Sequence, residues 1–154
     1  MPINEEEFKI YDPYDAYLNE VGDDQLKFNE LNNKIRGLPR SLFDFIFDVL
    51  PADFIKDRIS LALGLNENQS QETSKIVMEI ILTDVYLGNV IQEIKNRLNI
   101  DEQKSKTIAG LIVTELFAPI LEELKKIHVE KFAKNLPPQP QQQDDRIVNL
   151  KQSL

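Results

Sequence analysis

The chain contains no cysteine and only one histidine, His128. The absence of cysteine excludes disulfides, thiolate metal sites and thiol nucleophiles. A single histidine cannot build a metal site of several imidazoles, and the sequence offers no serine nucleophile elbow for a histidine-based triad. His128 could sense pH, but its position near the end of a predicted helix favours a partly exposed residue without a chemical role.

Long apolar runs and nucleotide-binding motifs are also missing. No stretch approaches the roughly 20 apolar residues that a membrane span needs. The opening residues, MPINEEEFKIYD, are acidic and carry no secretory signal, so we expect a cytoplasmic protein without a membrane span. There is no Gly-x-Gly-x-x-Gly and no phosphate-binding loop with Lys-Ser/Thr. We therefore predict neither a cofactor nor an enzymatic activity.

The charge balance is acidic, with a net charge of −8. Residues 1–34 hold nine acids and three bases, so most of the excess lies in this part of the chain. Such a surface repels a phosphate backbone, and we expect that nucleic acid is not the partner. The competing hypothesis is a ribosome- or nucleic-acid-associated factor that uses the basic residues around Lys95–Lys106 and Lys125–Lys134.

The stretch from Lys106 to His128 is the most apolar part of the chain. Between Ile108 and Phe117 only a glycine, a threonine and a glutamate interrupt the apolar residues. A helix that is apolar nearly all round must be enclosed by other elements, so we predict one long central helix here. Pro119 removes a backbone donor and predicts a kink within that helix.

The same stretch carries a short motif that follows the apolar run. The motif reads Phe117-x-Pro119-Ile120-x-Glu122-x-Leu124-Lys125-Lys126-Ile127-His128. It resembles a segment that recurs in small uncharacterised helical proteins of reduced-genome candidate-phyla bacteria. The resemblance implies two helix–loop–helix units before the motif and a Pro-rich tail after it, an order found here from about Leu38 to Pro140. The chain departs from the family at Leu121 (usually Arg) and Glu123 (usually Ser). The resemblance implies a fold and no activity.

Capping residues divide the rest of the chain into further helices. The predicted N-caps are Asp12, Asp23 or Asp24, Ser41, Asn66 or Ser70, and Asp101. The helix that follows Asn66 is expected to reach Leu87. The organisation predicted is an acidic arm with peripheral helices over 1–36, of which 1–10 are loosely ordered, a helical domain over 37–134, and a Pro/Gln linker with a tail over 135–154.

Two segments of the predicted helical domain are similar to each other. Ile59, Leu63 and Asn66 correspond to Ile94, Leu98 and Asp101, and further matches follow in the next helix. We interpret this pattern as two repeated helix–loop–helix units. The fold class is therefore all-α, a compact orthogonal bundle of about six or seven helices with a kinked long C-terminal helix.

Two apolar features point to a protein partner. The predicted helix 41–50 carries three phenylalanines, including Phe43 and Phe47, which indicates deep burial or a partner. In the tail, Ile147, Val148 and Leu150 follow a linker without means to pack, which suits a docking segment; an inert tail is the alternative. Acidic residues on the apolar helices mark solvent-facing strips rather than a metal or catalytic pair. We predict an interaction or scaffold module whose partner is a protein, and a homo-oligomer is compatible with this.

Overall fold

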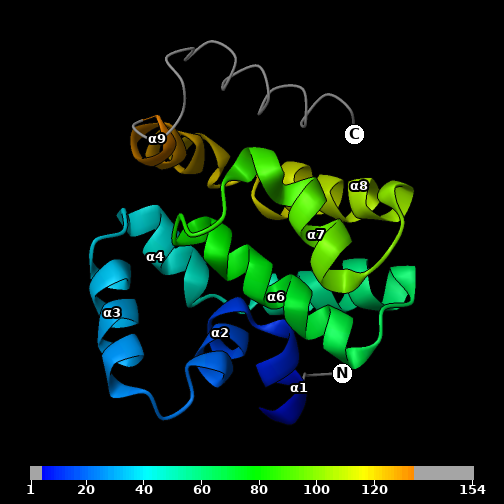
Figure 1. The fold of residues 1–154 in the computed structure, drawn as a ribbon, viewed down its shortest axis with the longest axis horizontal. Helices are drawn as coiled ribbons and strands as arrows, with labels where there is room; N and C mark the ends of the chain where they lie inside the picture. The colour runs from blue at the N-terminus through cyan, green and yellow to red at the C-terminus, as the bar shows by residue number, and fades with distance from the viewer. Residues whose placement is uncertain (1–4, 134–154) are drawn as a thin grey trace.

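The computed structural model describes residues 5–133, and all regular secondary structure in this range is helical (Figure 1). The α-helices are α1 (Glu5–Tyr11), α2 (Pro13–Val21), α3 (Gln25–Arg36), α4 (Arg40–Ile46), α5 (Leu50–Phe54), α6 (Glu67–Ile81), α7 (Val90–Leu98), α8 (Glu102–Gly110) and α9 (Leu121–Phe132). Two π-helices, η1 (Ile55–Leu61) and η3 (Leu111–Leu116), and one 3-10 helix, η2 (Leu87–Asn89), complete the set. The all-α prediction is confirmed, but six or seven helices is too low a count for the described range. None of these helices is long and apolar enough to cross a membrane.

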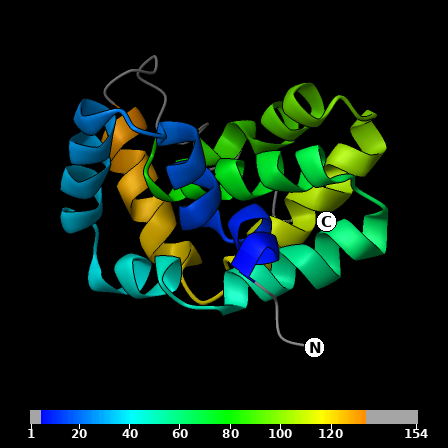
Figure 2. The same ribbon diagram turned by 90° about the horizontal axis from the view of Figure 1, so that it is seen from below.

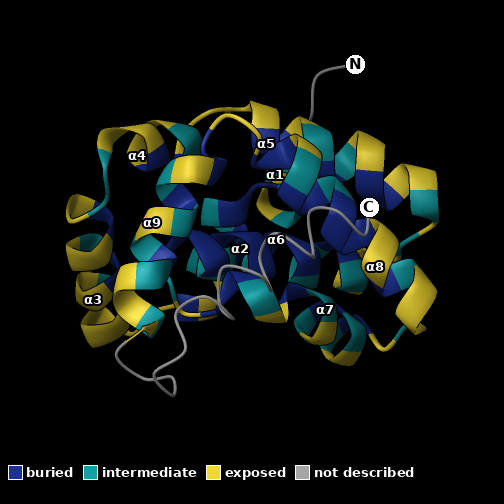
Figure 3. Ribbon diagram, turned by 90° about the horizontal axis from the view of Figure 1, so that it is seen from above, coloured by how far each residue is buried: buried dark blue, intermediate teal, exposed yellow. Residues whose placement is uncertain are grey.

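Helix α6 lies at the centre of the molecule and contacts α1, α2, α7 and η1 (Figures 1 and 3). Its second half, from Ile76 to Ile81, is fully buried except at Glu79. Because this half of the helix is apolar on nearly all sides, other helices must cover it to keep it from water. The central position thus belongs to α6 rather than to the 106–128 stretch, although that stretch also contributes fully buried residues such as Ile108 and Val113.

Most of the predicted helix starts are confirmed. The side chains of four N-cap residues each accept a hydrogen bond from the backbone N–H three residues later, and these residues are Asp12, Asp24, Asn66 and Asp101. Asn66 also forms a capping box with Gln69. Ser41 is the exception: α4 already begins at Arg40 after Pro39, without a side-chain cap.

Residues 5–11 form a helix, α1, instead of belonging to a loosely ordered arm. The Ser74 hydroxyl of α6 donates a hydrogen bond of 2.7 Å to the Ile10 carbonyl. The Lys56 ammonium of η1 forms an ion pair of 3.0 Å with Glu7. Because these partners are more than 40 residues away, the local sequence gives no sign of the helix.

Helix α6 ends at Ile81, well before the predicted end at Leu87. Thr83 has a φ of +64°, a left-handed conformation that a continuing helix does not allow. Asp84, in the loop that follows, accepts a hydrogen bond of 2.7 Å from Lys34 of α3 and one of 3.4 Å from Tyr17 of α2. These contacts connect the loop to two other helices and stabilise its non-helical conformation.

Pro119 lies in a turn between two helices, and the prediction of one kinked helix is therefore wrong. Helical structure stops at Leu116, residues 117–120 form turns, and α9 begins at Leu121. The Ile120 N–H bonds to the Phe117 carbonyl at 2.9 Å, which closes the turn around the proline. Both Phe117 and Ile120 are buried, so the turn itself contributes to the core.

The apolar run from Ile108 to Phe117, predicted to be enclosed, is buried at Ile112 and Leu116, and Ile80 and Ile81 of α6 are buried as well. Leu111 was predicted to be buried with them but is only partly buried. It begins the π-helix η3, and the wider turn of that helix places Ile112 and Val113 inside the molecule instead.

The neighbours Ile112 and Leu111 provide a matched test of the core. We expect Ile112→Ala to lower the free energy of unfolding by about 2–5 kcal/mol, because it leaves a cavity in a fully buried site. Leu111→Ala should cost clearly less, since part of that side chain is already in water. Urea unfolding followed by circular dichroism measures both. Equal losses for the two variants would contradict the burial described here.

Candidate functional site

A groove of about 730 Å³ opens on the surface between α4, α5, η1, the end of η3 and the 117–120 turn. Figure 2 shows α4, α5 and η1 (cyan to teal) along one edge of the molecule, with the turn before α9 beside them. Pro39 and Pro51 stand at the starts of α4 and α5 and fix where these short helices begin. The sequence predicts helices in these regions but does not indicate that they come together around a groove.

The floor of the groove is apolar. Leu116 and Ile120 are buried beneath it, and Phe45 and Phe54 are partly exposed at its sides. Leu50 is 65% exposed although it lines the groove. An exposed leucine next to other apolar side chains in a hollow is typical of a binding surface rather than of a core edge.

The rim of the groove is acidic. Five carboxylates line it, and they are Asp44, Asp48, Asp53, Asp57 and Glu115. Asp44 pairs with Arg40 at 3.1 Å on the same helix, and Glu115 pairs with Arg58. Asp53 and Asp57 form no ion pair with any residue between 5 and 133. The rim therefore offers negative charge that is available to an incoming cation.

Arg58 is the one basic residue among those that line the groove. Its guanidinium lies 5.4 Å from the centre of the Phe54 ring and 2.7 Å from a carboxylate oxygen of Glu115. The ion pair joins η1 to η3 across the groove. Both of these elements are π-helices, a form found frequently at functional sites.

The predicted site residues Phe43 and Phe47 are exposed, at 36% and 52%, but do not line the groove. Their rings contact each other with centroids 5.0 Å apart, and Phe47 also contacts Tyr14 of α2 at 5.1 Å. They form a separate aromatic pair on α4. The other predicted site residues, Ile147, Val148 and Leu150, lie outside the described residues.

His128 is fully buried, and the prediction of a partly exposed residue is wrong. Its Nδ1 accepts a hydrogen bond of 3.1 Å from the Leu87 N–H, and its Nε2 donates one of 2.7 Å to the Ile80 carbonyl. This assignment satisfies both nitrogens with a neutral ring. His128 thus joins α9 to the end of α6 and to η2, and no local sequence pattern indicates these two long-range partners.

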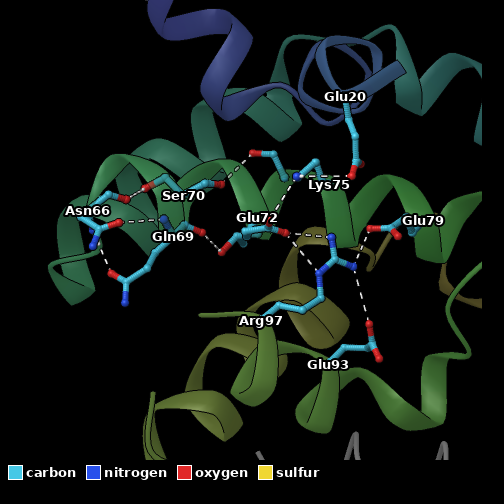
Figure 4. Close-up of polar contacts among 11 residues, drawn as sticks. Glu20, Asn66, Gln69, Ser70, Glu72, Lys75, Glu79, Glu93 and Arg97 are labelled. Atoms are coloured by element: carbon cyan, nitrogen blue, oxygen red, sulfur yellow. Dashed lines mark hydrogen bonds and ion pairs between the residues drawn. The ribbon is translucent and has the colours of Figure 1, made fainter. Parts of the chain in front are cut away.

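The basic residues of the competing hypothesis do not form one surface. Arg97 of α7 bonds to Glu72 at 2.8 Å and Glu79 at 2.7 Å, both on α6 (Figure 4). Burial raises the pKa of Glu79 in spite of this contact; for Glu72, burial is outweighed by hydrogen bonds from Lys75 and Arg97, which lower its pKa overall. Arg97 is therefore used to hold α7 against α6.

The lysines of α9 lie on a different part of the molecule. Figures 1 and 3 place α9 and α8 at opposite ends. Lys125 contacts Glu122 at 3.6 Å, and the Lys131 ammonium lies 5.9 Å from the centre of the Phe132 ring. These lysines and those near α8 therefore do not combine into a continuous basic patch.

Acidic residues on the apolar helices do not gather around a common point. Within residues 5–133 there is no group of three or more histidine, aspartate or glutamate side chains placed to hold a metal ion. Thr83 and Asp84 follow α6 instead of continuing it, so neither shares a helical face with Glu79.

No protein-family model, curated protein or solved structure matches the chain. The resemblance carried by the Phe117–His128 motif stays a prediction. The groove is therefore the feature that bears most directly on function.

The single histidine gives a direct test of the buried His128 contact. Burial lowers the pKa of His128 to about 4. Below pH 6.5, the ordinary histidine pKa, His128 is protonated in the unfolded chain but stays neutral in the folded chain. This residue therefore lowers the free energy of unfolding as pH falls from 6.5 to 4, by up to roughly 3 kcal/mol. Burial raises the pKa of Asp12 to about 7, which acts in the opposite direction, so total stability alone does not isolate His128.

The imidazole C–H signals in a proton NMR spectrum isolate it, because no other histidine contributes. We expect these signals to stay at their neutral-ring positions from pH 8 down to about 5. A normal titration centred near pH 6.5 would contradict the hydrogen bonds to Leu87 and Ile80.

Proposed function

We propose that this protein is a non-enzymatic interaction or scaffold module whose groove binds a protein segment with apolar residues and basic flanks. The observation that carries the proposal is the combination of an apolar floor with five carboxylates and one arginine. An apolar segment covers the floor, and lysine or arginine side chains beside it meet Asp53 and Asp57. This is the general arrangement of a groove that receives a short peptide or an amphipathic helix.

The two parts of the groove contribute differently to binding. Burial of apolar area at Leu50, Phe45 and Phe54 supplies most of the affinity, at about 25 cal/mol per Å² before the costs of association are subtracted. The carboxylates are exposed, so each contributes little energy but together they attract a cationic partner and disfavour an anionic one. We therefore expect micromolar binding that weakens as salt is added.

The charge of the rim also bears on self-association. A twofold dimer that used this face would place the same five carboxylates opposite each other, and like charges at such an interface cost free energy. A homo-oligomer, if formed, is expected to use another face.

The competing hypothesis of nucleic-acid binding has weaker support. Arg97 is occupied by Glu72 and Glu79, and the lysines of α9 lie away from those near α8. The groove, with its apolar floor and five carboxylates, repels phosphate.

We further propose that the helical units around Asn66 and Asp101 arose by duplication and that the helices form an orthogonal bundle. In support, both residues cap a helix, and a serine four positions later donates to the capping residue's carbonyl in each case, Ser70 at 2.8 Å and Ser105 at 2.7 Å. The same local hydrogen-bond pattern thus recurs 35 positions apart.

A synthetic peptide tests the groove without knowledge of the natural partner. The probe is a fluorescein-labelled 14-residue amphipathic helix of leucine and lysine, titrated with the full chain by fluorescence anisotropy at about 50 mM salt. We expect Leu50→Ser and the double variant Asp53→Asn/Asp57→Asn each to weaken binding, by up to about 10-fold, because they remove the exposed part of the floor and two rim charges. All three positions are exposed in the free chain, so the variants should fold.

The matched control is Asp23→Asn/Glu130→Gln, which removes two exposed carboxylates elsewhere on the surface. It should leave the affinity nearly unchanged. A second control is a serine and lysine peptide of equal charge, which should bind much more weakly. Equal losses for the groove and control variants, or equal binding of the two peptides, would show that only net charge attracts the probe.

A further inference from the structure

We infer that the chain carries its own ligand for the groove: the segment Arg146–Lys151 occupies it in cis and competes with the partner. This inference rests on the proposed function, since it concerns the same site. The segment belongs to residues 134–154, which lie outside the described range. Its sequence fits the position and the charge of the groove.

The segment has the composition that the groove selects. It reads Arg-Ile-Val-Asn-Leu-Lys, so three aliphatic residues, Ile147, Val148 and Leu150, stand between two basic residues. The aliphatic side chains match the apolar floor, and Arg146 and Lys151 match a rim in which Asp53 and Asp57 form no ion pair with residues 5–133. Asp144 and Asp145 precede the segment and are disfavoured at this rim, which limits the binding to the six residues that follow them.

The connection has the length that docking in cis requires. The groove includes Pro119 and Ile120, which directly precede α9. Helix α9 has 12 residues and so carries the chain roughly 18 Å away from the groove. The 12 residues numbered 134–145 reach at most about 40 Å when fully extended, which is about twice this distance. The return distance therefore falls within the ordinary reach of this connection.

Attachment makes even a weak contact effective. A short connection that can span the distance between the two sites gives an effective concentration of about 1 mM at the groove. Three aliphatic residues with two basic flanks bind with a dissociation constant on the order of 100 µM when separate, because ordering costs offset much of the burial. The groove is then occupied about ten times more often than it is open, and an external ligand binds about tenfold more weakly. An external partner therefore needs an affinity high enough to displace the segment from the groove.

The experiment uses the full chain in three forms: unchanged, with Ile147→Ser/Val148→Ser/Leu150→Ser, and with the control substitutions Gln141→Ser/Gln142→Ser/Gln143→Ser in the connection. The probe is the labelled leucine and lysine peptide. We expect the first variant to bind it 5- to 10-fold more tightly than the unchanged chain, and the control to bind it as the unchanged chain does. A synthetic peptide of residues 144–154 should bind the first variant at about 100 µM and displace the probe. Sedimentation should find all forms monomeric at 5 µM.

Each other outcome overturns the inference. Equal probe affinity of all three forms means that the segment does not occupy the groove; the proposed function survives in that case if Asp53→Asn/Asp57→Asn still weakens the probe. If that double variant has no effect in any form, the proposed function fails as well. A dimer that is lost in the Ile147→Ser/Val148→Ser/Leu150→Ser variant would place the segment on a second copy and overturn docking in cis.

Discussion

The burial of α6 is the constraint on which the other features of the structure depend. Its residues from Ile76 to Ile81 leave only Glu79 partly exposed, and even this carboxylate is bonded to Arg97 of α7. A helix of this kind is stable only when others enclose it. Helices α1 and α2 cover one part of it, α7 another and η1 a third, and Figure 3 shows the buried residues gathered around it. Each covering helix is short, so the chain must turn often, and the turns carry much of the specific polar bonding.

The groove is a consequence of this arrangement. Helix η1 packs on α6 and α8 packs on α7, and the chain turns at residues 117–120, after η3, before α9 begins. Phe117 and Ile120 point into the core from that turn, and Phe117 contacts the Phe45 ring of α4 with centroids 6.0 Å apart. The short helices α4 and α5 then border a hollow that no described side chain fills. The apolar floor of the groove is the outer face of the core, and the carboxylates of the rim surround that face with hydrated charges.

Local features of the sequence predicted the fold better than they predicted the site. Asp12, Asp24, Asn66 and Asp101 act on the N–H groups of the next turn, so their capping could be recognised without knowledge of distant contacts. The end of α6 depends on Lys34 and Tyr17 holding Asp84, and the burial of His128 depends on Leu87 and Ile80, which are more than 40 residues away. No local pattern contains that information.

The groove was missed for a related reason. Phe43 and Phe47 were predicted to bind a partner because they are aromatic residues in a short apolar helix, yet they form a pair beside α2 and do not line the groove. The useful signal was the regular recurrence of aspartate at positions 44, 48, 53 and 57 between apolar residues. The spacing of four between Asp53 and Asp57 places these two side chains on one side of successive turns from α5 into η1, and Asp44 and Asp48 lie on α4 and in the turn after it. Only the fold brings Glu115 and the 117–120 turn to the same place.

The central claim, that the groove is where a partner binds, is tested most directly by paramagnetic NMR. The full chain is labelled at its Ile, Leu and Val methyl groups and mixed with the leucine and lysine peptide carrying a nitroxide at one end. Leu26 of α3 is an internal control, because it is 75% exposed and lies outside the groove. The account predicts strong broadening of the methyl signals of Leu50, Leu116 and Ile120, and none at Leu26. Equal broadening at Leu26 and Leu50, or broadening at Leu26 alone, would contradict it.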